Sequence, residues 1–276
     1  MHVTAKQKQY TLQQILTYLD CPLVYHLKYE KKIQSPISVT RLNKGLIYKE
    51  SMDETIAYYY RGHLEKKPPT LKQMYDRFYS LWMEKTDTVN ENSILTRRLE
   101  DSGHLTRQEI SEHIQVGYNA IRSFYLKNND LKQSILGVNF PFEIVLNSGV
   151  IVGHIPLIRE VEYHPNQRRI EMLDFTTTKK RQYLDEKNIS PHNVLLSFAF
   201  RSVMKMEPDR YFMHSLTQDE LADVNVSAND YKKFFRMVNA FLQSVDTIEP
   251  YIPPNARYPD PFFKELCENY TFPTKA

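Results

Sequence analysis

Strand-forming residues interrupted by turn residues dominate positions 142–181 of this 276-residue chain. Two turns are marked, one by Asn147-Ser148-Gly149 and one by His164-Pro165-Asn166-Gln167. The strand formers around them are Ile144, Leu146, Val150, Val152, Ile158, Val161, Ile170, Met172 and Leu173. This pattern predicts a meander of three strands. Because the second turn is hairpin-sized, residues 149–162 and 169–174 are expected to pair antiparallel.

Helical periodicity precedes the meander. Residues 10–28 carry apolar side chains at helical spacing. Thr11 is available as an N-cap of this helix, and Pro22 predicts either a second helix or a kink in the first. Residues 41–60 predict a further helix.

Two more helical stretches and a strand complete the pattern. Residues 70–128 carry two apolar stripes typical of core helices, and the polar residues 85–106 between them predict a loop or a small helical insertion. After the meander, residues 194–204 predict an apolar helix, residues 209–216 a strand, and residues 231–245 an amphipathic helix.

The order of these elements predicts an α/β fold with a mixed sheet of about four or five strands and helices on both faces. We expect one domain over residues 1–276. Its parts are a mainly helical region (1–130), a core sheet with its helix (131–220), and a C-terminal helix with a tail (221–276).

The composition is that of an ordinary globular chain, with 41% hydrophobic and 25% charged residues and a net charge of +3. This charge permits a basic groove without demonstrating nucleic-acid binding. No apolar run approaches the roughly 20 residues of a membrane span, and the N-terminus has no apolar signal core. We therefore expect a cytoplasmic protein without membrane contact. The two cysteines make no disulfide framework.

The meander carries a resemblance to a known family. A glycine in the second strand, an acidic residue ending the third and a basic run after it resemble the core of the PD-(D/E)XK nucleases. The nearest branch is RecB-like, similar to AddB and the CRISPR-associated exonucleases, with G-x-x-D on one strand and D-Y-K-T on the next. Gly153 keeps the glycine and Asp174 the second carboxylate. Pro156 stands at the first metal-binding aspartate, and Thr176 replaces the lysine.

The family's next helix opens with Q-x-x-x-Y, and the matching residues here are Val194 and Phe198. In the family a further strand pairs beside the meander, and residues 209–216 match it. The resemblance therefore implies a restriction-endonuclease-like core whose active site is degenerate.

The N-terminal helix also resembles the family's entry segment, through Tyr18-Leu19-Asp20-Cys21-Pro22. In members with an iron-sulfur cluster, this cysteine is the first ligand and three more lie near the C-terminus. Here Cys267 is kept, whereas Tyr270 and Ala276 stand where others would be expected. Because such clusters require four thiolates, we expect no cluster, and Cys21 and Cys267 are interpreted as core cysteines that can lie close together.

The resemblance extends to residues 45–50, which match a G-x-x-x-H-E run whose histidine has become Lys49. Family members hold divalent cations with carboxylates, generate hydroxide beside the scissile phosphate and stabilise charge with the lysine. Pro156 supplies no carboxylate, Thr176 no charge, and Asp174 alone would hold Mg²⁺ weakly. We therefore expect no catalytic residues, no bound metal and no cofactor.

Three functions remain open. The first is a catalytically inactive nuclease fold, kept as a DNA-binding or scaffolding subunit of a phage or bacterial machine for replication, recombination or transcription. The second is a divergent active nuclease that uses Asp174, Glu171 or Glu160, and Lys179 or Lys180. The third is a protein-interaction subunit of a nucleic-acid-processing complex that makes no nucleic-acid contact itself.

On the first hypothesis, the expected partner is DNA. In the family the substrate backbone passes over the C-terminal ends of the core strands. Here that edge would be flanked by Lys49 and by the run Lys179, Lys180 and Arg181. Loss of a carboxylate at Pro156 would also remove a charge that repels phosphate.

Overall fold

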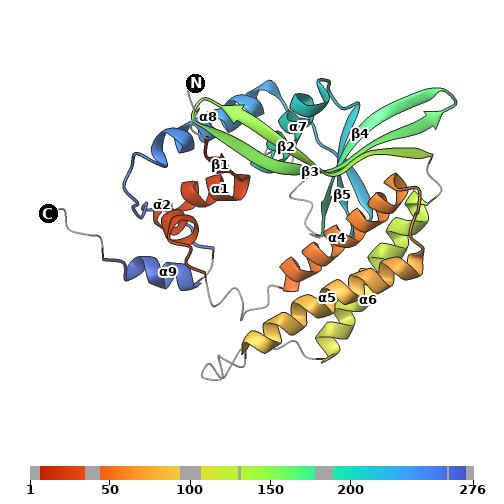
Figure 1. Cartoon of the computed structure of the whole chain (residues 1–276), viewed down its shortest axis with the longest axis horizontal. Helices are drawn as coiled ribbons and strands as arrows, with labels where there is room; N and C mark the ends of the chain where they lie inside the picture. The colour runs from red at the N-terminus through yellow and green to blue at the C-terminus, as the bar shows by residue number, and fades with distance from the viewer. Residues whose placement is uncertain are drawn as a thin grey trace, which may run out of the picture. The chain divides into compact units, whose positions relative to one another are not determined.

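A computed structural model describes residues 7–34, 44–93, 107–129, 132–177, 189–259 and 261–271. Internal contacts divide the chain into two compact units. The first unit comprises Met1–Arg41, Glu143–Gly153 and Lys232–Ala276, and the second comprises Leu42–Phe142 and His154–Tyr231. In Figure 1, which colours the chain from red at the N-terminus to blue at the C-terminus, the first unit therefore combines red, green and blue segments. The expectation of a single domain remains a prediction.

The sheet contains the predicted meander and two later strands. These are β2 (Gln133–Leu146), β3 (Gly149–His164), β4 (Gln167–Thr176), β5 (Arg210–Ser215) and β6 (Glu220–Asp223). Together with β1 (Gln9–Tyr10) they form a six-stranded sheet in the order β1-β3-β4-β5-β6, with β2 pairing with β3 off this path, rather than the four or five strands predicted. β3 and β4 are antiparallel with Leu157 opposite Leu173, whereas β4 and β5 are parallel with Asp174 opposite Met213. The sheet is therefore mixed, and the predicted antiparallel hairpin is confirmed.

Local chemistry explains the β3–β4 turn. Asn166 has φ 66°, in the left-handed region that asparagine tolerates better than most residues. Pro165 precedes it and cannot donate a ladder hydrogen bond. The chain therefore reverses direction between β3 and β4 at the residues where the sequence predicts a turn.

Three helices cover one face of this sheet, namely α4 (Lys44–Leu64), α5 (Leu71–Ser93) and α6 (Arg107–Asn128). Figure 1 shows them running side by side. Their buried core includes Tyr59, Phe78, Trp82 and Phe124, which pack against Leu157, Leu173, Phe175 and Phe212 of the strands. α5 and α6 approach closely, because a Cβ at Gly117 would lie 2.4 Å from the Phe78 ring.

The fourth helix, α7 (Pro191–Met204), lies on the opposite face. Side chains alternate along a strand, so Tyr211 points away from the face that buries Phe212. Its hydroxyl donates to Asn193 Oδ1 at 3.4 Å, which places the start of α7 there. Helices thus flank both faces of the mixed sheet, as the α/β prediction required.

The first unit is built around an aromatic cluster. It contains β1 (Gln9–Tyr10), α1 (Leu12–Asp20), α2 (Pro22–Tyr25), the π-helix η1 (His26–Glu30), most of α8 (Ala228–Ser244) and α9 (Pro261–Glu268). The rings of Tyr10, Tyr18 and Tyr25 lie 4.9, 5.2 and 5.9 Å from Phe241. Thr11 caps α1 in a capping box with Gln14, as predicted.

The structure corrects several predicted boundaries. Tyr10 is not helical but pairs with Ile151 in β1, since Thr11 takes the cap position after it. α5 continues to Ser93, because the polar stretch after residue 85 contains no Pro or Gly that would end a helix there. β2 begins at Gln133, before the apolar run that marked it. No helix among the described residues is long and apolar enough to cross a membrane.

Candidate functional site

Asp174 lies near the C-terminal end of β4, in the position predicted for the family's retained carboxylate. It is 7% exposed, and Oδ1 accepts the backbone N–H of Phe175 at 2.8 Å. Oδ2 lies 3.0 Å from Nε2 of His192. A carboxylate can only accept, so Nε2 carries the proton and donates it. Both oxygens of Asp174 therefore already have hydrogen-bond donors from the protein.

His192 comes from the first turn of α7, and the local sequence explains its position. Ser190 caps the helix by accepting the Asn193 N–H, and Pro191 occupies a first-turn position that needs no donor. The His192 side chain remains 51% exposed, whereas that of Asp174 is 11% exposed. Burial lowers the pKa of His192, but the hydrogen bond and charge of Asp174 outweigh it, so the pKa is raised above 6.5.

A second carboxylate approaches this pair from α4. Asp53 forms an ion pair with Lys49 one turn earlier in the helix, and its Oδ1 is buried without a hydrogen-bond partner. Burial raises the pKa of Asp53, and the charge of Asp174 raises it further, although Lys49 opposes both effects. Lys49 also repels the protonated imidazole and so lowers the pKa of His192. The four groups are therefore close enough to interact electrostatically.

The family resemblance implies a divalent cation at this site, and the donors present do not fit one. Mg²⁺ and Ca²⁺ need several free oxygen ligands. Asp174 already accepts two N–H groups, and Asp53 faces an ammonium. Among the described residues, no group of three or more His, Cys, Asp or Glu side chains is arranged to hold a metal ion. Instead Asp174 accepts from His192 and Asp53 pairs with Lys49.

The other uncharged residues of the predicted vestigial site lie in the sheet and in α7. Thr176 lies on the same sheet face as Asp174, because side chains two residues apart on a strand share a face. Leu157 of β3 pairs with Leu173 of β4, so their neighbours Pro156 and Asp174 both point to the opposite face. Val194 is 2% exposed in α7. The ring of Phe198 lies 6.3 Å from that of Tyr231. None of these side chains supplies a charge to the site.

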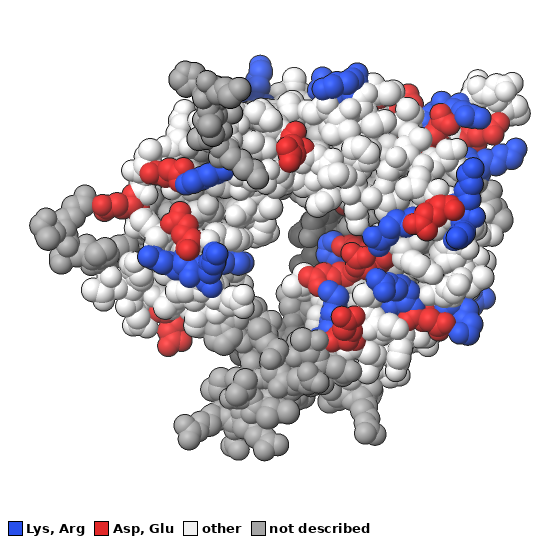
Figure 2. All heavy atoms as spheres, in the orientation of Figure 1, with Lys and Arg blue, Asp and Glu red and all other residues white. Residues whose placement is uncertain are grey.

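The basic run that was predicted to contact DNA, namely Lys179, Lys180 and Arg181, lies outside the described residues. Lys49 is described, and it is paired with Asp53 rather than isolated. In Figure 2, cations and carboxylates interleave over α4 and α5 and form no single-sign patch. The pairs there include Lys85–Glu50, Arg61–Glu54 and Lys72–Asp76.

The carboxylates considered for a rearranged nuclease site, Glu171 and Glu160, form ion pairs with arginines instead. Glu171 is three residues before Asp174 and therefore points to the opposite face of the sheet, where it is fully buried. Arg159 Nε donates to its Oε2 at 3.0 Å, and the Tyr163 hydroxyl donates to Oε1. Glu160 binds Arg168 at 2.9 Å. Neither of these carboxylates shares a site with Asp174.

Two members of the observed site, His192 and Asp53, were missed by sequence reasoning. The signal for Asp53 was its spacing of four residues from Lys49, which places both on one helical face. The signal for His192 was its place after Ser190-Pro191, the helix-start motif that follows the strand carrying Asp174. The hydrogen bond between His192 and Asp174 could not be predicted from their separation along the sequence.

The two cysteines of the first unit lie together, as expected. Cys21 and Cys267 are both free thiols, buried in one cluster with Leu23, Val24 and Phe263. Burial, together with the neighbouring Cys21, raises the pKa of Cys267 to about 12. Tyr270 packs against this cluster, and Ala276 lies outside the described residues. Two buried thiols do not provide the four ligands of an iron-sulfur cluster.

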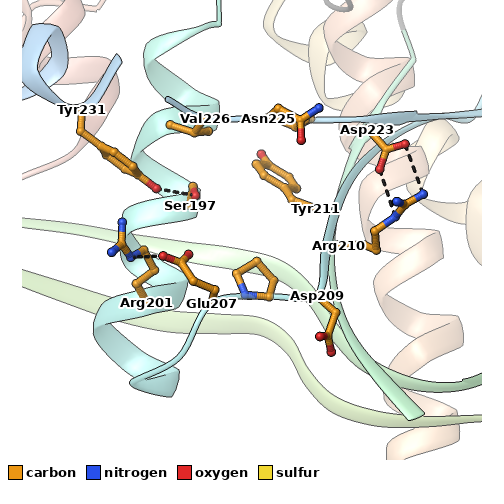
Figure 3. Close-up of a pocket in the computed structure, with 12 residues that line it drawn as sticks. Ser197, Arg201, Glu207, Asp209, Arg210, Tyr211, Asp223, Asn225, Val226 and Tyr231 are labelled. Atoms are coloured by element: carbon orange, nitrogen blue, oxygen red, sulfur yellow. Dashed lines mark hydrogen bonds and ion pairs between the residues drawn. The ribbon is translucent and has the colours of Figure 1, made fainter. Parts of the chain in front are cut away.

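A polar pocket of about 350 Å³ opens at the other end of β5, where the strand begins. Figure 3 shows its arginines turned toward carboxylates, Arg201 toward Glu207 and Arg210 toward Asp223. The first pair is separated by 2.8 Å and the second by 3.2 Å. Because both guanidinium groups are already paired and Asp209 adds another carboxylate, the pocket offers phosphate no net positive charge.

Comparisons with known proteins provide no established identity. No family model and no curated protein matches the chain. Among solved structures, the chain is similar to a protein from Eubacterium rectale described as "Putative exonuclease". The two are 9% identical with a TM-score of 0.47, and the match covers 98% of this chain and 91% of the other. This identity is too low to transfer an activity, so function has to be inferred from the site's own residues.

Proposed function

We propose that this chain is a catalytically inactive nuclease-fold protein that binds DNA, as a DNA-binding or scaffolding subunit of a phage or bacterial nucleoprotein machine. One observation carries the proposal: His192 is hydrogen-bonded to Asp174 where the family would hold a metal ion. The second nearby carboxylate, Asp53, has Lys49 as its partner. The site thus keeps its position at the strand end without a free set of carboxylate ligands.

The same pairing removes an obstacle to phosphate. Unpaired carboxylates beside a phosphodiester would repel it unless a metal ion stood between them. Here Asp53 is paired with Lys49 and Asp174 already accepts from His192, so the negative charge that Asp53 would present to a bound backbone is reduced. We include the run Lys179, Lys180 and Arg181 in the proposed contact surface, because it follows the strand that carries Asp174.

The experiment measures binding and cleavage of labelled single- and double-stranded DNA over a salt series, with Mg²⁺, Mn²⁺ or EDTA present. We expect salt-dependent binding and intact DNA in every metal condition. In a variant with Lys179, Lys180 and Arg181 changed to Ala, each lost phosphate contact should flatten the duplex salt slope by roughly 0.9. The matched control variant changes three other basic residues to Ala. These are Lys66, Lys67 and Lys72, which lie much earlier in the sequence than the basic run.

Metal-dependent cleavage that disappears in Asp174→Ala would contradict the proposal. Absence of DNA binding at every salt concentration would contradict it in a different way and would favour a subunit that contacts only proteins. An unchanged salt slope in the triple Ala variant would place the DNA-binding surface elsewhere on the chain.

A divergent metal-dependent nuclease is the second candidate, and one observation favours it. Asp53 Oδ1 is buried without a hydrogen-bond partner, and Asp53 interacts electrostatically with Asp174. On this hypothesis, Mn²⁺-dependent cleavage should be lost in both Asp53→Asn and Asp174→Asn. It should persist in Glu160→Gln, whose carboxylate binds Arg168 instead. Cleavage retained in Asp53→Asn would exclude this role for Asp53.

A further inference from the structure

The polar pocket at the start of β5 is separate from the Asp174 site. β4 and β5 run parallel, with Asp174 opposite Met213, whereas the pocket lies where β5 begins at Arg210. All of its lining residues belong to the second unit. Its volume of about 350 Å³ is at the lower end of the range of small-molecule sites. The pocket can therefore hold a small organic molecule or one long side chain.

Aromatic rings form part of the pocket wall. In Figure 3 the side chains of Tyr211 and Tyr231 line the pocket, and the Tyr231 hydroxyl lies 2.7 Å from the Ser197 hydroxyl. Arg201 lies over the Tyr231 ring, with its guanidinium carbon 5.4 Å from the ring centroid. The face of an aromatic ring attracts positive charge. The aromatic part of the wall therefore favours cations over anions.

The charged residues of the pocket leave one negative charge unbalanced. Glu207 is paired with Arg201, and Asp223 is paired with Arg210. Asp209 is the third carboxylate of the lining, and no cation among the described residues forms an ion pair with it. Two arginines and three carboxylates give the lining a net charge of −1. The pocket therefore repels phosphate and is complementary to a single positive charge.

The backbone holds Asp209 in a fixed position. Its N–H donates to the Ile170 carbonyl at 2.9 Å, and its Oδ2 accepts the Ile170 N–H at 2.7 Å. Lys205 ends α7 in the left-handed conformation with φ 58°, which lets the chain turn from the helix into the pocket lining. A carboxylate that is already positioned loses little conformational freedom when it binds a ligand. Its second oxygen, Oδ1, keeps lone pairs for such a contact.

We propose that this pocket binds one organic cation, an ammonium or guanidinium group, with Asp209 as its hydrogen-bond acceptor. The carboxylate receives the group through charge-assisted hydrogen bonds, and the tyrosine rings contact the rest of the ligand. Among the described residues, no carboxylates are grouped to hold a metal ion, which favours an organic cation over a divalent one. The cation is supplied by a free small amine or by a basic side chain of a partner polypeptide, because both offer the same chemistry. This inference goes beyond the proposed DNA binding, and either can fail without the other.

The test measures binding of two small probes to the full chain by ligand-observed NMR, at neutral pH and constant ionic strength. Propylguanidinium carries one positive charge, and propylurea has nearly the same shape without that charge. Propylguanidinium should bind about tenfold more tightly, because hydrogen bonds between charged groups are stronger than neutral ones. Equal affinity for the two probes would overturn the proposal.

Three variants locate the site, and their thermal transitions verify that each one folds. Asp209→Asn keeps an acceptor for the Ile170 N–H but removes the charge, so affinity for propylguanidinium should fall by about tenfold. Asn225→Trp adds bulk at an exposed position of the lining and should obstruct binding. Asp246→Asn is the matched control, because Asp246 is an exposed carboxylate of the first unit paired with Lys8, and its loss should leave affinity unchanged. Wild-type affinity in Asp209→Asn would overturn the role of Asp209, and wild-type affinity in Asn225→Trp would overturn the pocket as the site.

A short neutral peptide with one central arginine and blocked ends distinguishes the two sources of the cation. Binding at least as tight as that of propylguanidinium would assign the pocket to a basic side chain of a partner polypeptide. Binding of propylguanidinium alone would assign it to a free small amine. The same peptide with citrulline in place of arginine is the uncharged control and should bind about tenfold more weakly than the arginine peptide. If neither cationic probe binds the wild type, the proposal is overturned, whatever the affinity for DNA.

Discussion

Replacing Glu171 by Leu is expected to destabilise the second unit strongly, because it leaves Arg159 charged and buried without its partner. The two side chains are 0% and 5% exposed, and Arg159 Nη2 lies 2.9 Å from Glu171 Oε2. Breaking a buried ion pair by removing one partner costs about 3–5 kcal/mol. The Tyr163 hydroxyl loses its acceptor as well. We therefore expect a loss of about 3–5 kcal/mol in the free energy of unfolding.

The sheet itself offers a matched control. Glu160 and Arg168 also pair between β3 and β4, with the same separation of 2.9 Å, but their side chains are 27% and 64% exposed. Glu160→Leu should cost no more than about 1 kcal/mol, because exposed pairs contribute little. The comparison of Glu171→Leu with Glu160→Leu isolates the effect of burial, because both Arg–Glu pairs join β3 and β4 at the same separation.

The double variant Arg159→Met/Glu171→Leu completes the cycle. Replacing both partners by apolar residues of similar volume should recover most of the loss, because no buried charge is then left unpaired. Asn128, which accepts from Arg159 at 3.2 Å, would still accept from the Tyr60 hydroxyl at 3.2 Å.

Urea unfolding followed by tryptophan fluorescence is the suitable assay, because the chain has a single tryptophan and Trp82 lies in the core of the second unit. If Glu171→Leu costs no more than Glu160→Leu, the buried pair does not support the sheet as we argue. The assignment of Glu171 to structure rather than to a catalytic site would then lose its basis.

Three further predictions concern the N-cap of α1, the reactivity of the two buried thiols, and the loss of stability at acidic pH. Thr11→Ala should lower the stability of the first unit by about 0.5–2 kcal/mol in chemical denaturation, because its side chain accepts the Gln14 N–H; no measurable change would mean that the cap contributes nothing. Cys21 and Cys267 should react with a thiol reagent only after denaturation, since both are buried and the pKa of Cys267 is raised to about 12; fast reaction in native buffer would refute this. Burial lowers the pKa of His214, so its contribution to stability should be present above about pH 6.5 and lost as the pH falls. Unfolding midpoints of His214→Gln and the wild type should therefore converge on acidification, and a constant difference would exclude the linkage.

Much of the fold could be predicted because its determinants are local. Turn residues such as Asn166 separate the strands, and Thr11 begins α1 through contacts within four residues. The antiparallel pairing of β3 and β4 follows from a short turn between apolar runs. These signals depend on spacing along the chain, which a sequence displays directly.

The site was harder to predict because its contacts are non-local. Asp174 was identified from a motif, but its partner His192 comes from another element 18 residues later. Asp53 approaches from α4, and nothing in its sequence neighbourhood indicates a strand end so far along the chain. Glu171 is different, since its spacing of three residues from Asp174 already indicated opposite faces of a strand. That signal was present and would have excluded Glu171 from a shared site.

The central claim is that resident side chains, His192 for Asp174 and Lys49 for Asp53, rather than divalent metal ions, are the partners of the carboxylates of this site. The most direct test compares oligonucleotide affinity and integrity in EDTA and in Mn²⁺ at matched ionic strength, with wild type and Asp174→Asn side by side. The account predicts that wild-type affinity is the same in both buffers and that the oligonucleotide stays intact. Wild-type binding or cleavage that requires Mn²⁺ and is lost in Asp174→Asn would contradict it.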